Sequence, residues 1–222
     1  MHTKGNGVGL KELADREAEL LLIVESATGL MEEKAKQLEG VHARYLTIYS
    51  QYQALLTNPA CSLEALKRVV FLCWYSVSEP FMFTGLRDLP SDMPSVYPYL
   101  ERDRGSARPD SELSWMLPWY YHISEYAFPN LAKAPLLASF LASADPQAYL
   151  SVPADERHVE NRGQMGRYWD SVGQAIPPVT TPESSEELHQ LKKELARLQR
   201  RSFWSRFSGA LKSKWTKSGQ DF

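Results

Sequence analysis

The chain has 222 residues, of which 43% are hydrophobic and 23% charged, so it is long enough for one substantial domain with extensions or for two small ones. Its longest apolar run, Val69–Tyr75, is far too short to span a bilayer, and its first residues contain no apolar run typical of a signal peptide. The two cysteines, Cys61 and Cys73, form no CxxC pair. We therefore expect a cytoplasmic protein with two inert thiols.

Charge is distributed unevenly along the chain. Residues 192–222 carry nine Lys or Arg against two acids, a net charge of +7, whereas the remaining 191 residues carry 16 against 25, a net charge of −9. An acidic body with a basic tail is compatible with self-docking, with an anionic membrane or with a nucleic-acid backbone.

Residues 1–57 are expected to form an N-terminal helical hairpin, because apolar residues recur there every three or four positions. Twelve of fourteen positions on this stripe are apolar, and the two exceptions are Glu17 and Lys34. A repeat of this kind is typical of a coiled coil, but apolar flanking positions widen the stripe, which favours packing against several neighbours in a bundle. Gly29 predicts a break that would turn the segment back on itself. The stripe comprises Leu10, Leu13, Glu17, Leu20, Val24, Ala27, Met31, Lys34, Leu38, Val41, Tyr45, Ile48, Tyr52 and Leu55.

Residues 58–172 are expected to form an aromatic-rich helical core that packs with residues 10–57 as one domain. A helix is predicted to begin near Ser62 and to end by about Ser78, because Pro80 disfavours a helical conformation at the residue before it. A second helix should begin at Asp110 or Ser111 and be apolar on nearly all sides. The intervening residues 89–111, rich in Pro, Ser and charge, predict a long loop with at most one short helical turn. No segment alternates as a strand would, so the fold class is all-α.

Glu79 and His122 are the candidate catalytic residues. A carboxylate at the C-terminal end of a helix faces the negative end of the helix dipole, so some group should compensate it. The favoured interpretation is a structural ion pair with Arg68 or Arg87. The alternative places Glu79 beside His122 in an aromatic-lined cleft, as a general acid/base pair or a small-ligand site.

No other motif in the sequence indicates catalysis or a cofactor. The five histidines are scattered without metal-ligand spacing, and no nucleotide-binding or nucleophile motif is complete. We therefore predict no metal site and no cofactor. The tryptophans and tyrosines of the middle segment could line a ligand pocket, but we favour a packed core.

The C-terminal region divides into a Pro/Thr/Ser linker, residues 173–183, and a helical arm, residues 184–222. Residues 188–198 form a short leucine stripe. Residues 200–217 follow with aromatic side chains on one face of the projected helix and small polar or basic ones on the other, which is typical of an interfacial amphipathic helix. Its expected contact residues are Phe203, Trp204, Arg206, Phe207, Leu211, Lys212, Trp215 and Lys217.

These features favour a non-enzymatic interaction protein, an adaptor or scaffold. Its arm would engage either a protein partner or an anionic membrane surface, the latter as a peripheral protein of the inner membrane face. Nucleic acid is the least favoured partner, because stacking on single strands requires a folded groove. A homo-oligomer could form through residues 10–55 or 188–198. The runner-up function remains an enzyme or small-ligand binder at Glu79 and His122.

Overall fold

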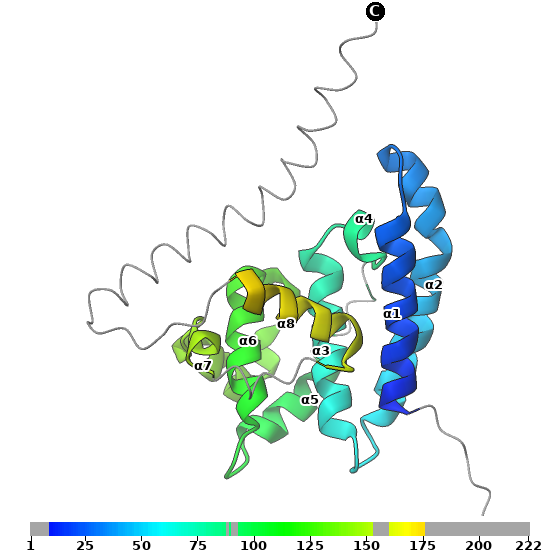
Figure 1. Ribbon diagram of the computed structural model, residues 1–222. Helices are drawn as coiled ribbons and strands as arrows, with labels where there is room; N and C mark the ends of the chain where they lie inside the picture. The colour runs from blue at the N-terminus through cyan, green and yellow to red at the C-terminus, as the bar shows by residue number, and fades with distance from the viewer. Residues whose placement is uncertain (1–8, 88, 90–92, 153–159, 176–222) are drawn as a thin grey trace, which may run out of the picture. The chain divides into compact units, whose positions relative to one another are not determined.

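The computed structural model describes residues 9–87, 89, 93–152 and 160–175, and all regular structure in these ranges is helical (Figure 1). The expectation of an all-α helical bundle with an N-terminal hairpin is therefore confirmed. The helices are α1 (Leu10–Ser26), α2 (Met31–Leu55), α3 (Ser62–Ser78), α4 (Phe81–Thr84), α5 (Met93–Arg104), α6 (Ser111–Ile123), α7 (Pro135–Ser143) and α8 (Gly163–Ala175). Short 3-10 turns cover Glu125–Ala127 (η1), Leu131–Lys133 (η2) and Ala148–Ser151 (η3).

The helices α1 and α2 form the predicted hairpin. The chain turns between them at Gly29, whose φ of +102° lies in the left-handed region that glycine adopts without strain. Glu33 caps the start of α2 by accepting a hydrogen bond from the backbone N–H of Leu30 at 2.9 Å. Most of the apolar stripe is buried inside the bundle, and Leu13 and Leu38 are among its members that are 0% exposed, whereas Met31 beside the turn is 69% exposed. An oligomer through residues 10–55 remains a prediction, and it would have to use the outer faces of these helices.

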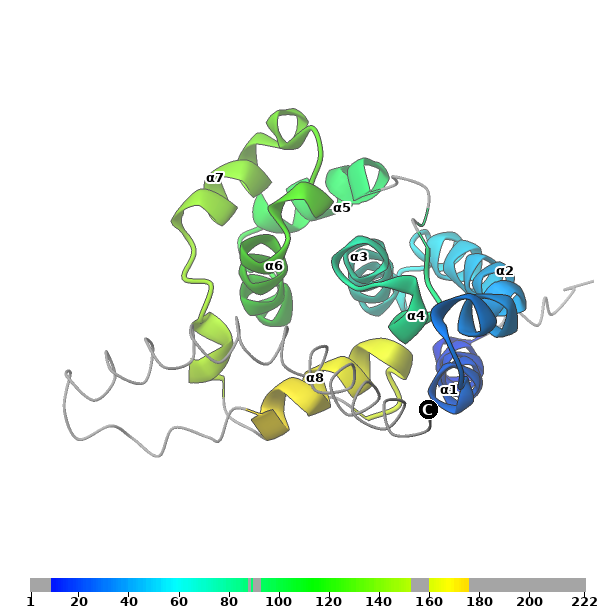
Figure 2. The same cartoon turned by 90° about the horizontal axis from the view of Figure 1, so that it is seen from above.

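The helix α3 occupies the centre of the bundle, with α1 and α2 on one side and α6 on the other (Figure 2). It is buried on nearly all sides, and Val69, Val70, Phe71 and Trp74 are each 0% exposed. The helix ends at Ser78, because the next residues, Glu79 and Pro80, are extended.

The segment between α3 and α6 differs from the predicted loop, because α5 covers twelve residues of it, Met93–Arg104. Pro94 lies in the first turn, where a helix needs no N–H donor, and Pro98 removes one internal hydrogen bond. Burial of Val96 and Leu100, each 0% exposed, offsets that loss. The helix α6 likewise continues through Pro118, and it begins as predicted, with Asp110 accepting a hydrogen bond from the N–H of Leu113 at 2.7 Å.

The aromatic residues of the middle segment pack in the core. Trp74 and Tyr120 stack with ring centroids 4.4 Å apart, and both side chains are 0% exposed. Trp169 of α8 meets Trp115 edge to face at 4.6 Å and donates a hydrogen bond from its Nε1 to the Tyr120 hydroxyl at 2.9 Å. The Trp74–Tyr120 stack thus joins α3 to α6, and the contacts of Trp169 join α8 to α6, so these rings belong to the core as expected.

Candidate functional site

Glu79 lies immediately after the last residue of α3, and its backbone N–H still donates to the carbonyl of Tyr75 at 3.2 Å. Its side chain is partly buried. Among the described residues, no Lys, Arg or His forms an ion pair with its carboxylate, and none is found to hydrogen-bond to it. Burial raises the pKa of Glu79 to about 7, so this carboxyl group changes its charge near neutral pH.

The two arginines expected to compensate Glu79 are engaged elsewhere. Arg68 pairs through Nε with Glu64 on its own helix at 2.8 Å, while its Nη1 donates to the carbonyl of Leu10 and to the hydroxyl of Tyr52, each at 2.9 Å. The Arg87 guanidinium lies over the ring of Phe81, 4.5 Å from the ring centroid. The predicted structural ion pair of Glu79 is therefore wrong, because tertiary packing directs both arginines to other partners.

His122 occupies the last turn of α6, and its side chain is exposed. No hydrogen bond or ion pair joins it to Glu79 among the described residues. The structure thus places both candidate residues at helix ends but does not join them into an acid/base pair.

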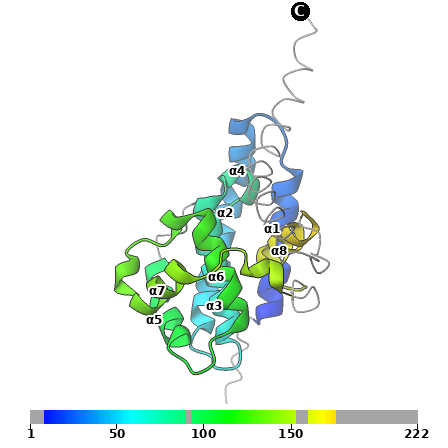
Figure 3. The same cartoon turned by 90° about the vertical axis from the view of Figure 1, so that its left-hand side faces the viewer.

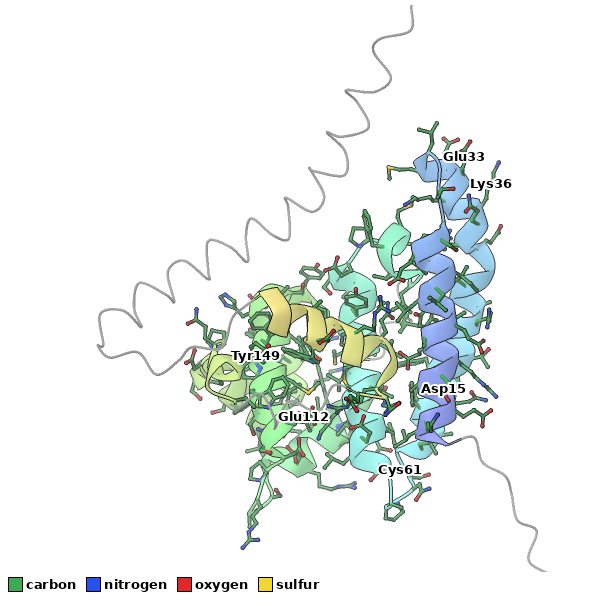
Figure 4. All side chains as sticks on the ribbon, viewed as in Figure 1. Asp15, Glu33, Lys36, Cys61, Glu112 and Tyr149 are labelled. Carbon is green, nitrogen blue, oxygen red and sulfur yellow. The ribbon has the colours of Figure 1, made fainter. Side chains whose placement is uncertain are left out.

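The most extensive polar cluster was not predicted. We call it the buried ion network, and its members are Glu64, Lys67, Arg68, Asp110, Glu112 and Arg162. Arg162, just before α8, pairs with Glu64 of α3 at 2.6 Å and also with Glu112, labelled in Figure 4, in the first turn of α6. Lys67 extends the network, with its Nζ 2.7 Å from Glu112 and 3.1 Å from Asp110.

The network compensates its own charges. The side chains of Arg162, Arg68 and Lys67 are 8%, 5% and 9% exposed, so little water remains to solvate them. Burial acts to raise the pKa of Glu64, but hydrogen bonds and charges from Arg162 and Arg68 outweigh it and hold this pKa below its ordinary value. We therefore interpret the buried ion network as a structural junction that joins α3, α6 and the start of α8.

A second buried carboxylate lies close by, on α1. Glu17 is 1% exposed, and its Oε1 accepts a hydrogen bond from the Tyr52 hydroxyl at 2.6 Å. Its Oε2 accepts from the backbone N–H of Gln164 at 2.8 Å, so a side chain of α1 caps the N-terminus of α8. Figure 3 shows the ribbon of α8 beside that of α1. Burial nevertheless raises the pKa of Glu17 to about 7, against the lowering effects of Tyr52, Gln164 and Arg68.

Glu17 was the residue in this region that the sequence could have indicated, because it is a charged residue on an apolar stripe. Arg162 carried no comparable signal, since it lies in a mixed segment without periodicity.

Two surface depressions are distinct from Glu79 and His122. One, of about 350 Å³, is lined by residues of the α2–α3 turn and by Tyr99 and Arg102 of α5. The other, of about 430 Å³, lies beside α7 and is lined in part by Arg104 and Phe140. Arg104 is engaged there, since it pairs with Asp103 and lies 4.5 Å from the Phe140 ring centroid.

Comparisons with known proteins give no family for this chain. No protein-family model, curated protein or solved structure matches it.

Some of the remaining sequence predictions concern residues that the structure describes, and others concern residues outside them. Within the described residues, no group of three or more His, Cys, Asp or Glu could hold a metal ion, and no helix is long and apolar enough to cross a membrane. Cys61 and Cys73 are not joined in a disulfide. Helix α8 extends to Ala175, into the segment predicted as linker. The expected contact residues of the arm, and the leucine stripe at 188–198, lie outside the described residues.

Proposed function

We propose that this protein is a non-enzymatic adaptor. A helical body serves as the scaffold, and the basic amphipathic segment 200–217 binds an anionic, partly apolar surface of a partner protein or of a membrane. The observation that carries the proposal is the segregation of charge, +7 over residues 192–222 against −9 over the rest. A cationic segment with aromatic side chains is attracted to such a surface and buries its rings there.

The arrangement of charges in the body supports a scaffolding role. The buried ion network joins three helical segments by paired charges, and breaking such pairs is costly. Groups held in this way orient helices and leave few charges available for chemistry. The body therefore suits a fixed platform better than a catalytic centre.

A second candidate function, small-ligand binding or acid/base chemistry at Glu79, is favoured by one observation. The carboxyl group is partly buried and has a pKa of about 7, a value suited to proton exchange at neutral pH. His122 does not approach it, so an acid/base pair of these two would need a rearrangement. We rank this function second.

Charge-matched variants of the full chain test the adaptor proposal. Arg206→Gln with Lys212→Gln removes two positive charges from the arm, and Lys36→Gln with Lys133→Gln removes two exposed charges from the body as the control. Both are assayed for binding to vesicles containing about 30% phosphatidylserine and to soluble polyglutamate. We expect the arm variant to bind about thirtyfold more weakly, since each of the two basic residues removed contributes about 1 kcal/mol near an anionic surface.

The two probes separate the kinds of partner. Binding to the vesicles with dependence on the arm supports a membrane surface, and binding to polyglutamate alone supports an acidic protein. Equal binding of the arm variant and the control variant to both probes would refute the proposal.

A further inference from the structure

Four consecutive residues of α5, from Glu101 to Arg104, are charged, and three of them are used within the fold. The Glu101 carboxylate accepts hydrogen bonds from two backbone N–H groups in the first turn of α7, at 3.3 and 2.7 Å. Asp103 and Arg104 pair with each other. Arg102 is the exception, because it is exposed and forms no ion pair or hydrogen bond with any described residue.

Arg102 lines the depression of about 350 Å³ between α5 and the turn that joins α2 to α3, which we call the α5 depression. Cys61, labelled in Figure 4, marks the position of that turn. None of the described lining residues is acidic, so nothing among them compensates the charge of Arg102. The other lining residues are apolar or carry hydroxyl groups, namely Leu56, Thr57, Pro59, Ser62 and Tyr99.

Hydrogen-bond donors in the α5 depression lack acceptors within the fold. The hydroxyl groups of Ser62 and Tyr99, like the Arg102 guanidinium, form no hydrogen bond with a described residue. The guanidinium carbon of Arg102 lies 5.7 Å from the Tyr99 ring centroid, a contact with a ring face that occupies none of its five N–H donors. A cation and several donors without an internal acceptor favour an anionic ligand.

The depression beside α7 provides the contrast. Arg104 also lies over an aromatic ring there, that of Phe140. Its donors, however, are taken by the Asp103 carboxylate, by the Ser114 hydroxyl at 3.0 Å and by the carbonyl of Asp110 at 3.2 Å. An arginine in this fold is therefore compensated where its role is structural, and Arg102 is not.

A phosphate group attached to an apolar or aromatic carbon matches the groups in the α5 depression. The planar guanidinium fork pairs with two phosphate oxygens, and hydroxyl groups serve a third. Leu56 and Pro59 supply apolar surface for the carbon part of the ligand, and the Tyr99 ring suits stacking against a flat one. The volume falls within the range of about 300–1,000 Å³ that is common for small-ligand sites.

We propose that the α5 depression is a binding site for a phosphate monoester carried on a small apolar or aromatic group. Arg102 pairs with the phosphate, and Ser62 and Tyr99 donate hydrogen bonds to it. A free organic phosphate and a phosphotyrosine side chain of a protein present the same chemistry, and the experiment separates these two sources. The site belongs to the helical body and makes no use of the arm, so it goes beyond the adaptor proposal.

The test titrates the full chain with phenyl phosphate while backbone amide NMR shifts are recorded. Benzyl alcohol, which keeps the ring without the charge, and inorganic phosphate, which keeps the charge without the ring, are the matched probes. We expect shift changes at Ser62, Tyr99 and Arg102 with phenyl phosphate. Phenyl phosphate should bind about tenfold more tightly than either matched probe, since it alone makes both the charged and the apolar contacts.

Two variants separate these contacts. Arg102→Gln should weaken binding of phenyl phosphate about tenfold, since a charge-assisted pair is lost. The matched control is Arg108→Gln, which removes an exposed charge that does not line the depression and should leave binding unchanged. Tyr99→Leu should weaken binding of phenyl phosphate about threefold and leave that of inorganic phosphate nearly unchanged, since only the ring contact is lost.

A capped pentapeptide with phosphotyrosine between alanines identifies the source of the phosphate. Tighter binding of this peptide than of phenyl phosphate supports the site and assigns it to a protein partner, and equal or weaker binding of the peptide assigns it to a free molecule. Equal binding of phenyl phosphate and benzyl alcohol would overturn the inference. So would equal binding by Arg102→Gln and Arg108→Gln, with circular dichroism showing that both are folded.

These outcomes are independent of the adaptor proposal. Failure of phenyl phosphate to bind would leave the arm's binding to anionic vesicles or polyglutamate untouched. Conversely, loss of the arm's binding with retention of the response to phenyl phosphate would refute only the adaptor proposal.

Discussion

Glu17 on α1 accepts a hydrogen bond at 2.8 Å from the backbone N–H of Gln164, at the start of α8 and 147 residues further along the chain. A buried carboxylate from the first helix thus caps the last described helix. This contact makes the position of α8, and with it the aromatic contacts of Trp169, depend on the N-terminal hairpin.

The backbone at Gly163 lies so close to the Glu17 carboxylate that a residue with a Cβ is strained at this position. Its φ is +57°, and an added Cβ would lie 2.6 Å from Glu17 Oε2. Gly163→Ala should therefore lower the free energy of unfolding by about 1–3 kcal/mol, as measured by urea denaturation. The matched control is Gly40→Ala in α2, where nothing lies within 4 Å of an added Cβ. That variant should be more stable than the parent by up to about 1 kcal/mol, and equal destabilisation by both would contradict the account.

Stability should depend on pH through Glu17. Its pKa is about 7 in the folded protein and near the ordinary value of 4.5 in the unfolded chain, so the folded state binds more protons between these values. The stabilisation due to this group is fully present below about pH 4.5 and is lost as pH rises through 7. Glu79, with the same shift, adds to this trend, and Glu64, whose pKa is lowered, opposes it at the acidic end.

Substitution separates these contributions to the pH dependence. Glu17→Gln should flatten the decline in stability between pH 5 and pH 7, and Glu17→Gln with Glu79→Gln should flatten it further. Thermal unfolding across this range measures the effect. A parent protein whose stability rises steadily through the same range, with no change in slope in either variant, would show that Glu17 is ionised without penalty.

Removal of Arg162 should be strongly destabilising. Arg162→Met leaves the carboxylates of Glu64 and Glu112 partly buried without their shared partner, at a cost of about 3–5 kcal/mol. The control is Arg167→Met, because Arg167 pairs with Glu25 with both side chains about half exposed, and such surface pairs contribute at most about 1 kcal/mol. Denaturant unfolding measures the free energy of unfolding of both variants. A similar decrease in both would show that burial of the ion network does not matter for stability.

Combined replacement tests whether the charges themselves cause that loss. Arg162→Met with Glu112→Gln restores equal numbers of acidic and basic groups, because Arg68 keeps Glu64 and Lys67 keeps Asp110, so it should recover part of the stability lost in the single variant. If this double variant is less stable than the single one, hydrogen bonds rather than uncompensated charge hold the junction.

Sequence patterns predicted those helices and turns whose start or end is determined by residues close by in the sequence. The three-four repeat and Gly29 predicted the hairpin, Pro80 predicted the end of α3, and Asp110 predicted the start of α6. The helix α5 was missed because its prolines and charged residues resemble a loop, whereas tertiary contacts, among them the burial of Val96 and Leu100, stabilise it.

The candidate site was predicted only in part, for the same reason. The position of Glu79 at a helix end follows from the sequence, but which arginine would reach it depends on how the helices pack. Arg68 turned toward Glu64 and Tyr52, and Arg87 toward Phe81. The role of Arg162 depends on contacts with residues far away in the sequence, 98 positions to Glu64 and 50 to Glu112, which no local pattern encodes.

The adaptor proposal makes the arm, and not the body, the binding element. Amide hydrogen exchange of the full chain, with and without the phosphatidylserine vesicles or polyglutamate, tests this most directly. We expect slower exchange within residues 200–217 in the presence of at least one probe, while amides of α1, α3, α6 and α8 exchange as before. Unchanged exchange in 200–217 with both probes, or protection confined to the body helices, would contradict the proposal.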